Sequence, residues 1–348
     1  MGVASIKTPW GGCPNQTGVR NSCYSGNNTT FTNITSSNLI FRVNKNNGKF
    51  DQVIADYFAT PANYGDSPAY IVDGSKDYFY ALIENTTTAG LRRLEKIEKN
   101  SWARSIFSNN TTALSTPLRS FIRLNNGDFV ISKSSALEYI NASNARIGAP
   151  YINPTAAPCN TSTTLISKVL QLNNGNFVFI HAAASQNRIG IFSATGGTAC
   201  LTAQAAPVAT AFPSAMAYDR INNKLFVAYA GNSTAVDLNS IYAYDINETT
   251  NTISNPQKIY DANAYPATYG YLLYGVSEMY LDQSNNTLFV ATAVSNATTV
   301  ANYSIEKFRV YPERIGTANS TVLQRLGNAP FYNFANDTRC ISGMFVGE

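Results

Sequence analysis

The chain has 348 residues, of which 44% are hydrophobic, so it can bury a sizeable core. Only 13% of the residues are charged, about half the share in an ordinary soluble domain, and 40 Asn, 30 Ser and 33 Thr supply the polar surface instead. The net charge of +4 is spread without a run of Lys or Arg, which argues against nucleic acid as a partner. No apolar run approaches the roughly 18 residues of a membrane span.

Residues 1–37 form the first predicted unit, an N-terminal segment rich in Gly, Asn and Thr that precedes a β-rich body over residues 38–348. The segment lacks the apolar stretch of a secretory signal. If the protein is secreted, we expect its signal to have been removed or to lie upstream of this numbering. Residues 38–43 and 50–55 then flank a polar turn, and we predict that they are the third and fourth strands of a blade with no first strand before them.

Five similar hairpins follow, each with an apolar run, a turn rich in Asn, Asp and Gly, and a second β-rich run. They cover residues 69–81, 119–131, 167–179, 214–228 and 277–291. Their starting points are 50, 48, 47 and 63 residues apart, a spacing typical of propeller repeats. A weaker pair of strands follows the hairpin, and four antiparallel strands make one blade.

The C-terminal run 341–346 matches the first strand of the fifth unit, with Met344 in the place of Met279. We therefore predict an all-β fold, a six-bladed β-propeller of four-stranded antiparallel blades whose last blade is shared between the N- and C-termini. That shared blade needs one more strand. Residues 2–7 or 29–35 of the same chain can supply it, or the N-terminal segment donates a strand to a neighbouring copy and builds a head-to-tail filament.

The hairpins resemble NHL- and YVTN-type repeat propellers, in which an apolar strand and an Asp-containing turn precede the pattern L-[YF]-V. The best matches are DRINNKLFV at 219–227 and DQSNNTLFV at 282–290. The resemblance covers most of the chain. It implies an architecture and not an activity, because one fold hosts many functions.

N-glycosylation motifs are the most specific signal in the sequence. Sixteen are present, whereas random placement of the Asn, Ser and Thr residues would give about seven. Their density predicts a secreted, extracellular or cell-surface glycoprotein. The predicted glycosylation sites are Asn15, Asn27, Asn28, Asn33, Asn85, Asn109, Asn110, Asn141, Asn160, Asn232, Asn247, Asn285, Asn296, Asn302, Asn319 and Asn336.

The five cysteines, Cys13, Cys23, Cys159, Cys200 and Cys340, are predicted to form disulfides with one thiol left over. We expect Cys159 to pair with Cys200, which lies about one blade away. Cys340 then pairs with Cys13 or Cys23, or those two pair with each other.

Candidate chemical groups are few. His181 is the only histidine, which makes a His-dependent catalytic triad or a zinc site implausible, and a structural role suits it better. Asp73, Asp219 and Asp282 occupy equivalent turn positions, where an Asx turn explains them better than a calcium site. We therefore predict no catalytic residue, no metal site and no cofactor.

Tyrosines crowd two crossovers between blades, and exposed aromatic rings stack on sugars and anchor protein interfaces. They form a possible binding face if they are exposed, whereas packing between blades would hide them. The candidates for this face are Tyr64, Tyr70, Tyr265, Tyr269, Tyr271 and Tyr274.

Three classes of function remain. The first is a structural extracellular glycoprotein without catalytic activity, a self-assembling subunit of a fibre or surface coat whose partners are copies of itself. The second is a propeller that binds carbohydrate or protein. The third, a propeller hydrolase or lyase, is suggested by analogy of fold alone.

Overall fold

The structure is a computed structural model of the chain. It describes residues 2–7, 39–57, 66–85, 92–109, 114, 118–133, 137–143, 145–152, 158–159, 166–181, 188–196, 200–207, 212–230, 240–261, 272–296, 299–317, 320–327, 331–333 and 340–346.

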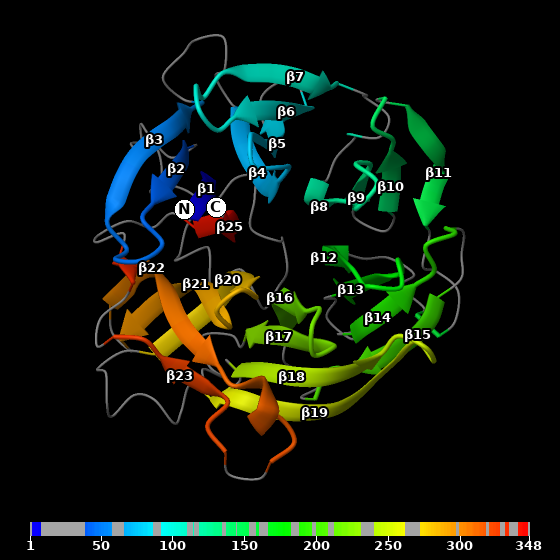
Figure 1. Cartoon of the computed structure of the whole chain (residues 1–348), viewed down its shortest axis with the longest axis vertical. Helices are drawn as coiled ribbons and strands as arrows, with labels where there is room; N and C mark the ends of the chain where they lie inside the picture. Colours follow the sequence, from blue (N-terminus) through cyan, green and yellow to red (C-terminus); the bar gives the residue numbers. More distant parts are fainter. Residues whose placement is uncertain are drawn as a thin grey trace.

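The described strands form six antiparallel sheets, which are the six blades of a ring (Figure 1). Blades 1 to 3 each contain four strands in sequence order, with the first at the centre of the ring. Blade 1 contains β4 (Asp66–Asp73), β5 (Tyr78–Asn85), β6 (Arg93–Glu98) and β7 (Arg104–Ser108). Blade 2 contains β8 (Leu118–Arg123), β9 (Phe129–Lys133), β10 (Leu137–Ile140) and β11 (Arg146–Ile152). Blade 3 contains β12 (Ile166–Gln171), β13 (Phe177–His181), β14 (Arg188–Phe192) and β15 (Cys200–Ala205).

The remaining blades follow the same plan, apart from an extra strand in blade 5 and a different strand order in blade 6. Blade 4 contains β16 (Phe212–Asp219), β17 (Lys224–Ala230), β18 (Ser240–Asn247) and β19 (Thr252–Asp261). Blade 5 contains β20 (Leu272–Asp282), β21 (Thr287–Asn296), β22 (Thr299–Val310) and β23 (Leu323–Arg325), with β24 (Tyr332–Asn333) also paired to β22. The short 3₁₀ helix η4 (Pro312–Arg314) lies between β22 and β23. Blade 6 contains β25 (Cys340–Val346), β1 (Gly2–Lys7), β2 (Leu39–Val43) and β3 (Phe50–Asp56). The predicted six-bladed, all-β propeller is confirmed.

The strand β1 fills the gap that the sequence left in blade 6. It lies between β25 and β2, with Ala4 opposite Met344 on one side and opposite Phe41 on the other. Gly2 faces Val346, so the two ends of the described chain lie beside each other near the centre of the ring (Figure 1). Of the two segments predicted to supply this strand from the same chain, residues 2–7 do so, and residues 29–35 lie outside the described part.

The turn residues explain why the hairpins form where the sequence predicts them. Gly127 and Gly175 have φ values of +91° and +90°, and Asn223 and Asn286 occupy the same left-handed region at +52° and +51°. Glycine and asparagine tolerate this region better than other residues. Asp219 accepts hydrogen bonds from the backbone N–H groups of Ile221 and Asn222, both at 3.0 Å. The Asx turn predicted for this position is therefore confirmed.

Side chains join neighbouring blades on one side of the ring, which we call the turn face. It carries the connections between the first and second strands and between the third and fourth strands of each blade, such as residues 172–176, 220–223 and 248–251. Glu248 of blade 4 accepts hydrogen bonds from the backbone N–H groups of Asn173 at 2.9 Å and Asn174 at 2.7 Å, both in blade 3. Gln283 of blade 5 accepts one from Arg220 of blade 4 at 3.1 Å. The first turns of blades 3 and 4 are thus each held by the next blade.

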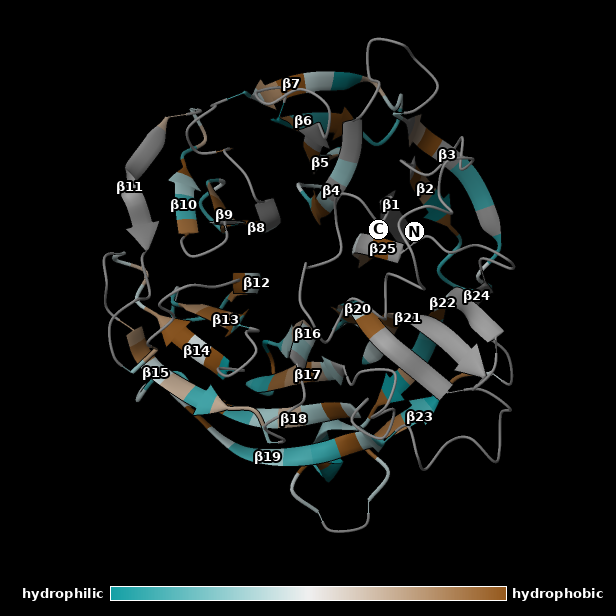
Figure 2. Cartoon of the chain, turned by 180° about the vertical axis from the view of Figure 1, so that it is seen from behind, coloured by the Kyte–Doolittle hydropathy of each residue, from teal (hydrophilic) through white to brown (hydrophobic). Residues whose placement is uncertain are grey.

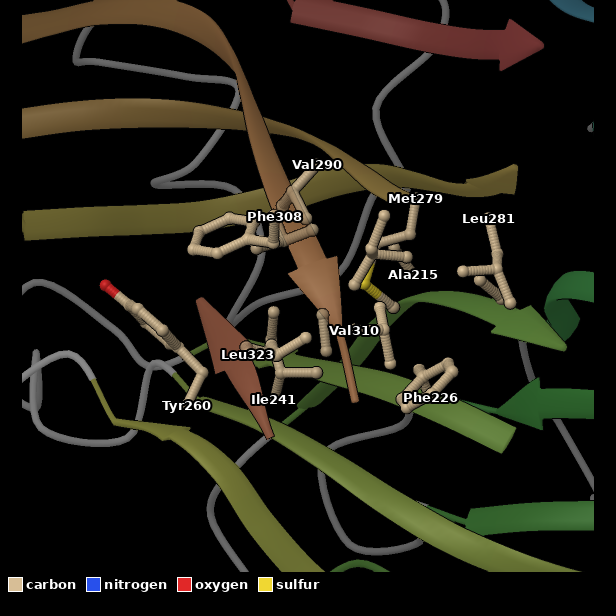
Figure 3. Packing of buried hydrophobic residues seen from close by; sticks show 14 of the residues in the cluster. Ala215, Phe226, Ile241, Tyr260, Met279, Leu281, Val290, Phe308, Val310 and Leu323 are labelled. Carbon is tan, nitrogen blue, oxygen red and sulfur yellow. The ribbon is translucent and has the colours of Figure 1, made fainter. Parts of the chain in front are cut away.

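The hydrophobic core is formed between the facing sides of neighbouring blades. Figure 3 shows Ile241 and Phe226 of blade 4 facing Met279, Phe308 and Leu323 of blade 5. Inner strands are buried on both faces, as in β13, whereas the outermost strand β19 alternates and is largely hydrophilic (Figure 2). Burial on both faces accounts for the continuous apolar runs of the inner strands.

Cys159 and Cys200 form a disulfide between the described residues, as predicted, with their Cα atoms 5.7 Å apart. The pairing of Cys13, Cys23 and Cys340 concerns side chains outside the described part of the chain. Within the described ranges, no helix is long and apolar enough to cross a membrane.

Candidate functional site

The innermost strand of each blade is interrupted by a β-bulge at an equivalent position. In β4, β8, β12, β16 and β20 the register shifts just before Tyr70, Ser120, Lys168, Ala215 and Glu278. In blade 6 the shift leaves Ser342 unpaired and precedes Gly343. A bulge re-aims the side chain beside it, and here it does so at one level of the ring.

These six positions alternate between large and small residues around the ring. Blades 1, 3 and 5 contribute Tyr70, Lys168 and Glu278, and blades 2, 4 and 6 contribute Ser120, Ala215 and Gly343. The three large side chains meet across the ring although their blades are not neighbours. The small residues between them leave the room for this contact. We call Tyr70, Lys168 and Glu278 the central cluster.

The central cluster is a buried ion pair with an aromatic partner. The Nζ atom of Lys168 lies 2.5 Å from Oε2 of Glu278, and their side chains are only 8% and 2% exposed. The hydroxyl of Tyr70 donates to Oε1 of Glu278 at 3.2 Å. Lys168 also lies over the Tyr70 ring, 4.2 Å from its centroid, in a cation–π contact. Both carboxylate oxygens therefore have partners.

Burial raises the pKa values of two members of the cluster, Glu278 and Tyr70. Desolvation raises the pKa of the Glu278 carboxyl, opposed by the Lys168 ammonium and by hydrogen bonds from Lys168, the Met279 N–H and Tyr70. Burial, followed by the charge of Glu278, holds the pKa of Tyr70 well above its ordinary value. The tyrosine hydroxyl therefore stays protonated and remains a donor to the carboxylate.

The chemistry open to the cluster is limited by its own pairing. Glu278 is the carboxylate at this level that could ligate a cation, and Lys168 already neutralises it. Among the described residues there is no group of three or more His, Cys, Asp or Glu side chains that could hold a metal ion. The cluster therefore links blades 1, 3 and 5 through polar contacts across the ring at the level of the bulges.

The other sequence candidates lie elsewhere. His181 ends β13 and is fully buried, opposite Ile166 and Arg188. Tyr70, predicted for an exposed binding face, points instead to the centre of the ring. Tyr274 lies in β20 but its side chain is outside the described part, as are all of Tyr64, Tyr265, Tyr269 and Tyr271.

Four predicted glycosylation sites have described side chains. Asn109, Asn247 and Asn285 are exposed at the ends of strands or in turns, and Asn141 is half-buried. Asn85, Asn296 and Asn302 lie in strands, with side chains outside the described part. The remaining sites fall outside the described residues, namely Asn15, Asn27, Asn28, Asn33, Asn110, Asn160, Asn232, Asn319 and Asn336.

Sequence reasoning missed Lys168 and Glu278. A signal for them was present, because both stand one residue after the start of an aligned hairpin, in the same column as Tyr70. Opposite charges in one column of an otherwise apolar repeat indicate contact across a ring. The alignment of neighbouring strands alone does not reveal it, because the partners are two blades apart.

Comparisons with known proteins identify the fold. No protein-family model and no curated protein sequence matches the chain. Among solved structures, the chain is similar to one in a nidogen/laminin complex, with a TM-score of 0.58, 8% identity and coverage of 98% of this chain and 97% of that one.

Two bacterial proteins are also similar. A Lactobacillus plantarum protein gives a TM-score of 0.53 at 12% identity, covering 93% of this chain and 82% of that one. A putative 6-phosphogluconolactonase from Bacteroides uniformis gives 0.52 at 11% identity, covering 85% and 79%. At such identities the likeness extends to the fold alone, and it agrees with the resemblance to NHL- and YVTN-type propellers.

Proposed function

We propose that this chain is a structural, N-glycosylated extracellular protein that assembles head-to-tail into a fibre or surface coat and has no catalytic activity. The observation that carries the proposal is the way in which β1 closes the ring. This strand pairs with β25 on one side and with β2 on the other, and 31 residues separate its end at Lys7 from the start of β2 at Leu39.

The same strand can complete the ring of another copy. If β1 leaves its own ring, β25 and β2 present two unpaired edges with a strand-wide gap between them. Unpaired edges bind a complementary strand, and a donor from the next copy would restore the same hydrogen bonds. A connection of 31 residues can span up to about 100 Å when extended, so it places no limit on this exchange. Because each copy donates one strand and accepts one, the contact is heterologous and grows into a filament.

Two further features support a structural role. The chain's own ion pair joins blades 3 and 5 across the ring, and it leaves no unpaired carboxylate in the central cluster for substrate chemistry. The exposed motif residues Asn109, Asn247 and Asn285 suit a glycan-covered surface with few charges. A propeller of similar fold in a nidogen/laminin complex is compatible with such a role, whereas the similar putative 6-phosphogluconolactonase is compatible with the enzyme class.

Negative-stain imaging of native material tests the assembly, because it predicts regular polymers. A monodisperse monomer under non-reducing conditions would overturn it. The route is tested by mixing two single variants, Ala4→Cys and Met344→Cys, in a background with Cys13, Cys23 and Cys340 replaced by Ser. These positions face each other in the register of β1 and β25. Strand donation predicts a disulfide between the two kinds of molecule, whereas a closed monomer gives none. The double variant Ala4→Cys/Met344→Cys is the matched control, since its disulfide forms in either case.

A carbohydrate- or protein-binding propeller is the second candidate. The tyrosines predicted for a binding face do not support it within the described part of the chain, because Tyr70 belongs to the central cluster. A polar pocket between blades 4 and 5, described in the next subsection, favours the binding of carbohydrate over the binding of protein.

A further inference from the structure

A cavity of about 510 Å³ lies in the notch between blades 4 and 5 at the turn face. Blade 4 contributes Lys224 at the start of β17, Asp245 near the end of β18, and the segment 255–257 of β19. Blade 5 contributes residues 315–317 from the connection that follows η4. The cavity thus forms between strands of blade 4 and a connection of blade 5.

The polar groups of the pocket are arranged by contacts with one another. Asp245 forms an ion pair with Lys224 and accepts a hydrogen bond from the Asn255 side chain at 2.7 Å. Gln257 accepts one from the Gly316 backbone N–H at 2.5 Å. Because its carbonyl oxygen is used in this way, Gln257 offers its NH₂ group as a donor. The lining therefore provides carboxylate, carboxamide and ammonium groups within a small space.

A bulge in β19 opens the pocket. Asp245 faces Ser254 and Ala243 faces Gln257, so one residue of β19 has no counterpart on β18. Asn255 lies in this bulge with a φ of +52°, and Pro256 follows it and has no N–H to give to the ladder. Asparagine tolerates this left-handed conformation better than most residues. Here it turns the Asn255 side chain toward Asp245.

The pocket also has an apolar part. Ile315 lines it and packs against the core between blades 4 and 5, the cluster drawn in Figure 3. Pro256 adds a second apolar surface at the rim. One ammonium and one carboxylate leave the lining without net charge, which favours neither a cation nor an anion. Hydroxyl groups need both donors and acceptors, and the carbon face of a sugar ring needs an apolar surface.

We propose that this pocket binds a neutral saccharide of one or two hexose or N-acetylhexosamine units. The proposal goes beyond assembly and does not depend on it. The saccharide has two possible sources. Asn247 stands two residues after Asp245 on the same strand, about 7 Å away on the same face of the sheet, so a glycan attached there would begin beside the pocket. The other source is a saccharide that does not belong to this molecule.

Unglycosylated protein, titrated with N,N′-diacetylchitobiose and with mannobiose and followed by NMR, tests the pocket. We expect binding of at least one probe at concentrations of about 10 mM or below. Gln257→Glu keeps an acceptor for the Gly316 N–H but removes the NH₂ donor, and we expect it to weaken binding about tenfold. Asp245→Asn should also weaken saccharide binding about tenfold, because it replaces the carboxylate acceptor of the pocket. Asp261→Asn is the matched control, because Asp261 also lies on β19 and pairs with Lys258 at 3.0 Å, but outside the pocket. Absence of binding by the wild type, or equal weakening by the control, would overturn the proposal.

Glycosylated protein distinguishes the two sources. If the glycan on Asn247 fills the pocket, the glycosylated wild type binds neither probe and Asn247→Gln restores the affinity of the unglycosylated chain. If the saccharide comes from another molecule, both glycosylated proteins bind as the unglycosylated chain does. Neither result bears on filament formation, so failure of the pocket and failure of the assembly are separable.

Discussion

Replacing Lys168 by Met removes the cation of the central cluster and leaves Glu278 as a 2%-exposed carboxylate without a counter-ion. Removal of one partner from a buried ion pair destabilises a protein by about 3–5 kcal/mol, because the remaining charge stays desolvated. We expect a loss of this size at pH 8, measured by urea unfolding with intrinsic fluorescence and circular dichroism as probes. A loss this large would distinguish the pair from an exposed one, which contributes about 1 kcal/mol or less.

The loss should depend on pH in a defined direction. The pKa of Glu278 is already raised above its ordinary value by burial, and removal of the Lys168 ammonium removes an opposing effect and raises it further. Because the folded state then binds the extra proton, stability falls as pH rises from the unfolded pKa toward the folded one. Lys168→Met should therefore cost little near pH 4 and progressively more toward pH 8, by up to about 1.4 kcal/mol per pH unit.

Two controls keep this reasoning falsifiable. Lys258→Met breaks a surface ion pair in the same propeller and should change stability by about 0.5 kcal/mol or less at every pH. The double variant Lys168→Met/Glu278→Leu removes both charges and should cost less than Lys168→Met alone at pH 8, because no charge remains buried without a partner. A cost for Lys168→Met that is below 1 kcal/mol, or that does not change between pH 4 and pH 8, would refute the assignment of a buried cross-ring pair.

Three further predictions follow from other contacts. Deletion of residues 1–7 should lower the unfolding temperature by several degrees, measured by calorimetry, and expose β25 and β2, measured by binding of a hydrophobic dye. An unchanged unfolding temperature would contradict the role of β1 in closing the ring. Glu248→Ala should cost about 1–3 kcal/mol in urea unfolding, because two backbone N–H groups of the blade 3 turn lose their acceptor, whereas the exposed Glu313→Ala should be neutral. Burial tends to raise the pKa of Asp245, but hydrogen bonds from Asn255 and Lys224 and the charge of Lys224 hold this pKa below its ordinary 3.8. The saccharide affinity of the pocket should therefore persist down to about pH 4 and be lost only at lower pH. Loss of affinity already at pH 6 would show that another group controls binding.

The sequence was sufficient to predict the blades. Each hairpin is a local structure, and its signals lie within about fifteen residues: two β-rich runs joined by a turn in which Gly127, Gly175 or Asn223 takes a left-handed conformation. Asp219 completes its turn with hydrogen bonds to residues two and three positions later. The disulfide of Cys159 and Cys200 could also be anticipated, because the cysteines are separated by about one repeat.

Contacts between distant blades could not be predicted in this way. Lys168 and Glu278 are 110 residues apart, and each looks like a polar interruption of an otherwise apolar strand. The pocket depends on a bulge at Asn255 and on a connection from the next blade, and the register of β19 cannot be read from its alternation. The candidate tyrosines were ambiguous for a different reason, because an aromatic ring with a hydroxyl suits both a surface and a polar interior. Tyr70 is half-buried and donates to Glu278 in the central cluster.

The central cluster and β1 together bear on how the ring unfolds. A linear array of repeats contacts only its neighbours, so it can lose stability one repeat at a time. In this ring, β1 joins the first and last parts of the chain within one blade, and the central cluster joins blades 1, 3 and 5 directly. Loss of any of these blades removes a partner from a buried charge in another. We therefore expect a single cooperative transition for the closed ring. A ring opened by deletion of residues 1–7 should retain the central cluster, so its unfolding should remain cooperative at lower stability. Lys168→Met should instead broaden the unfolding transition at pH 8, because blades can then open separately.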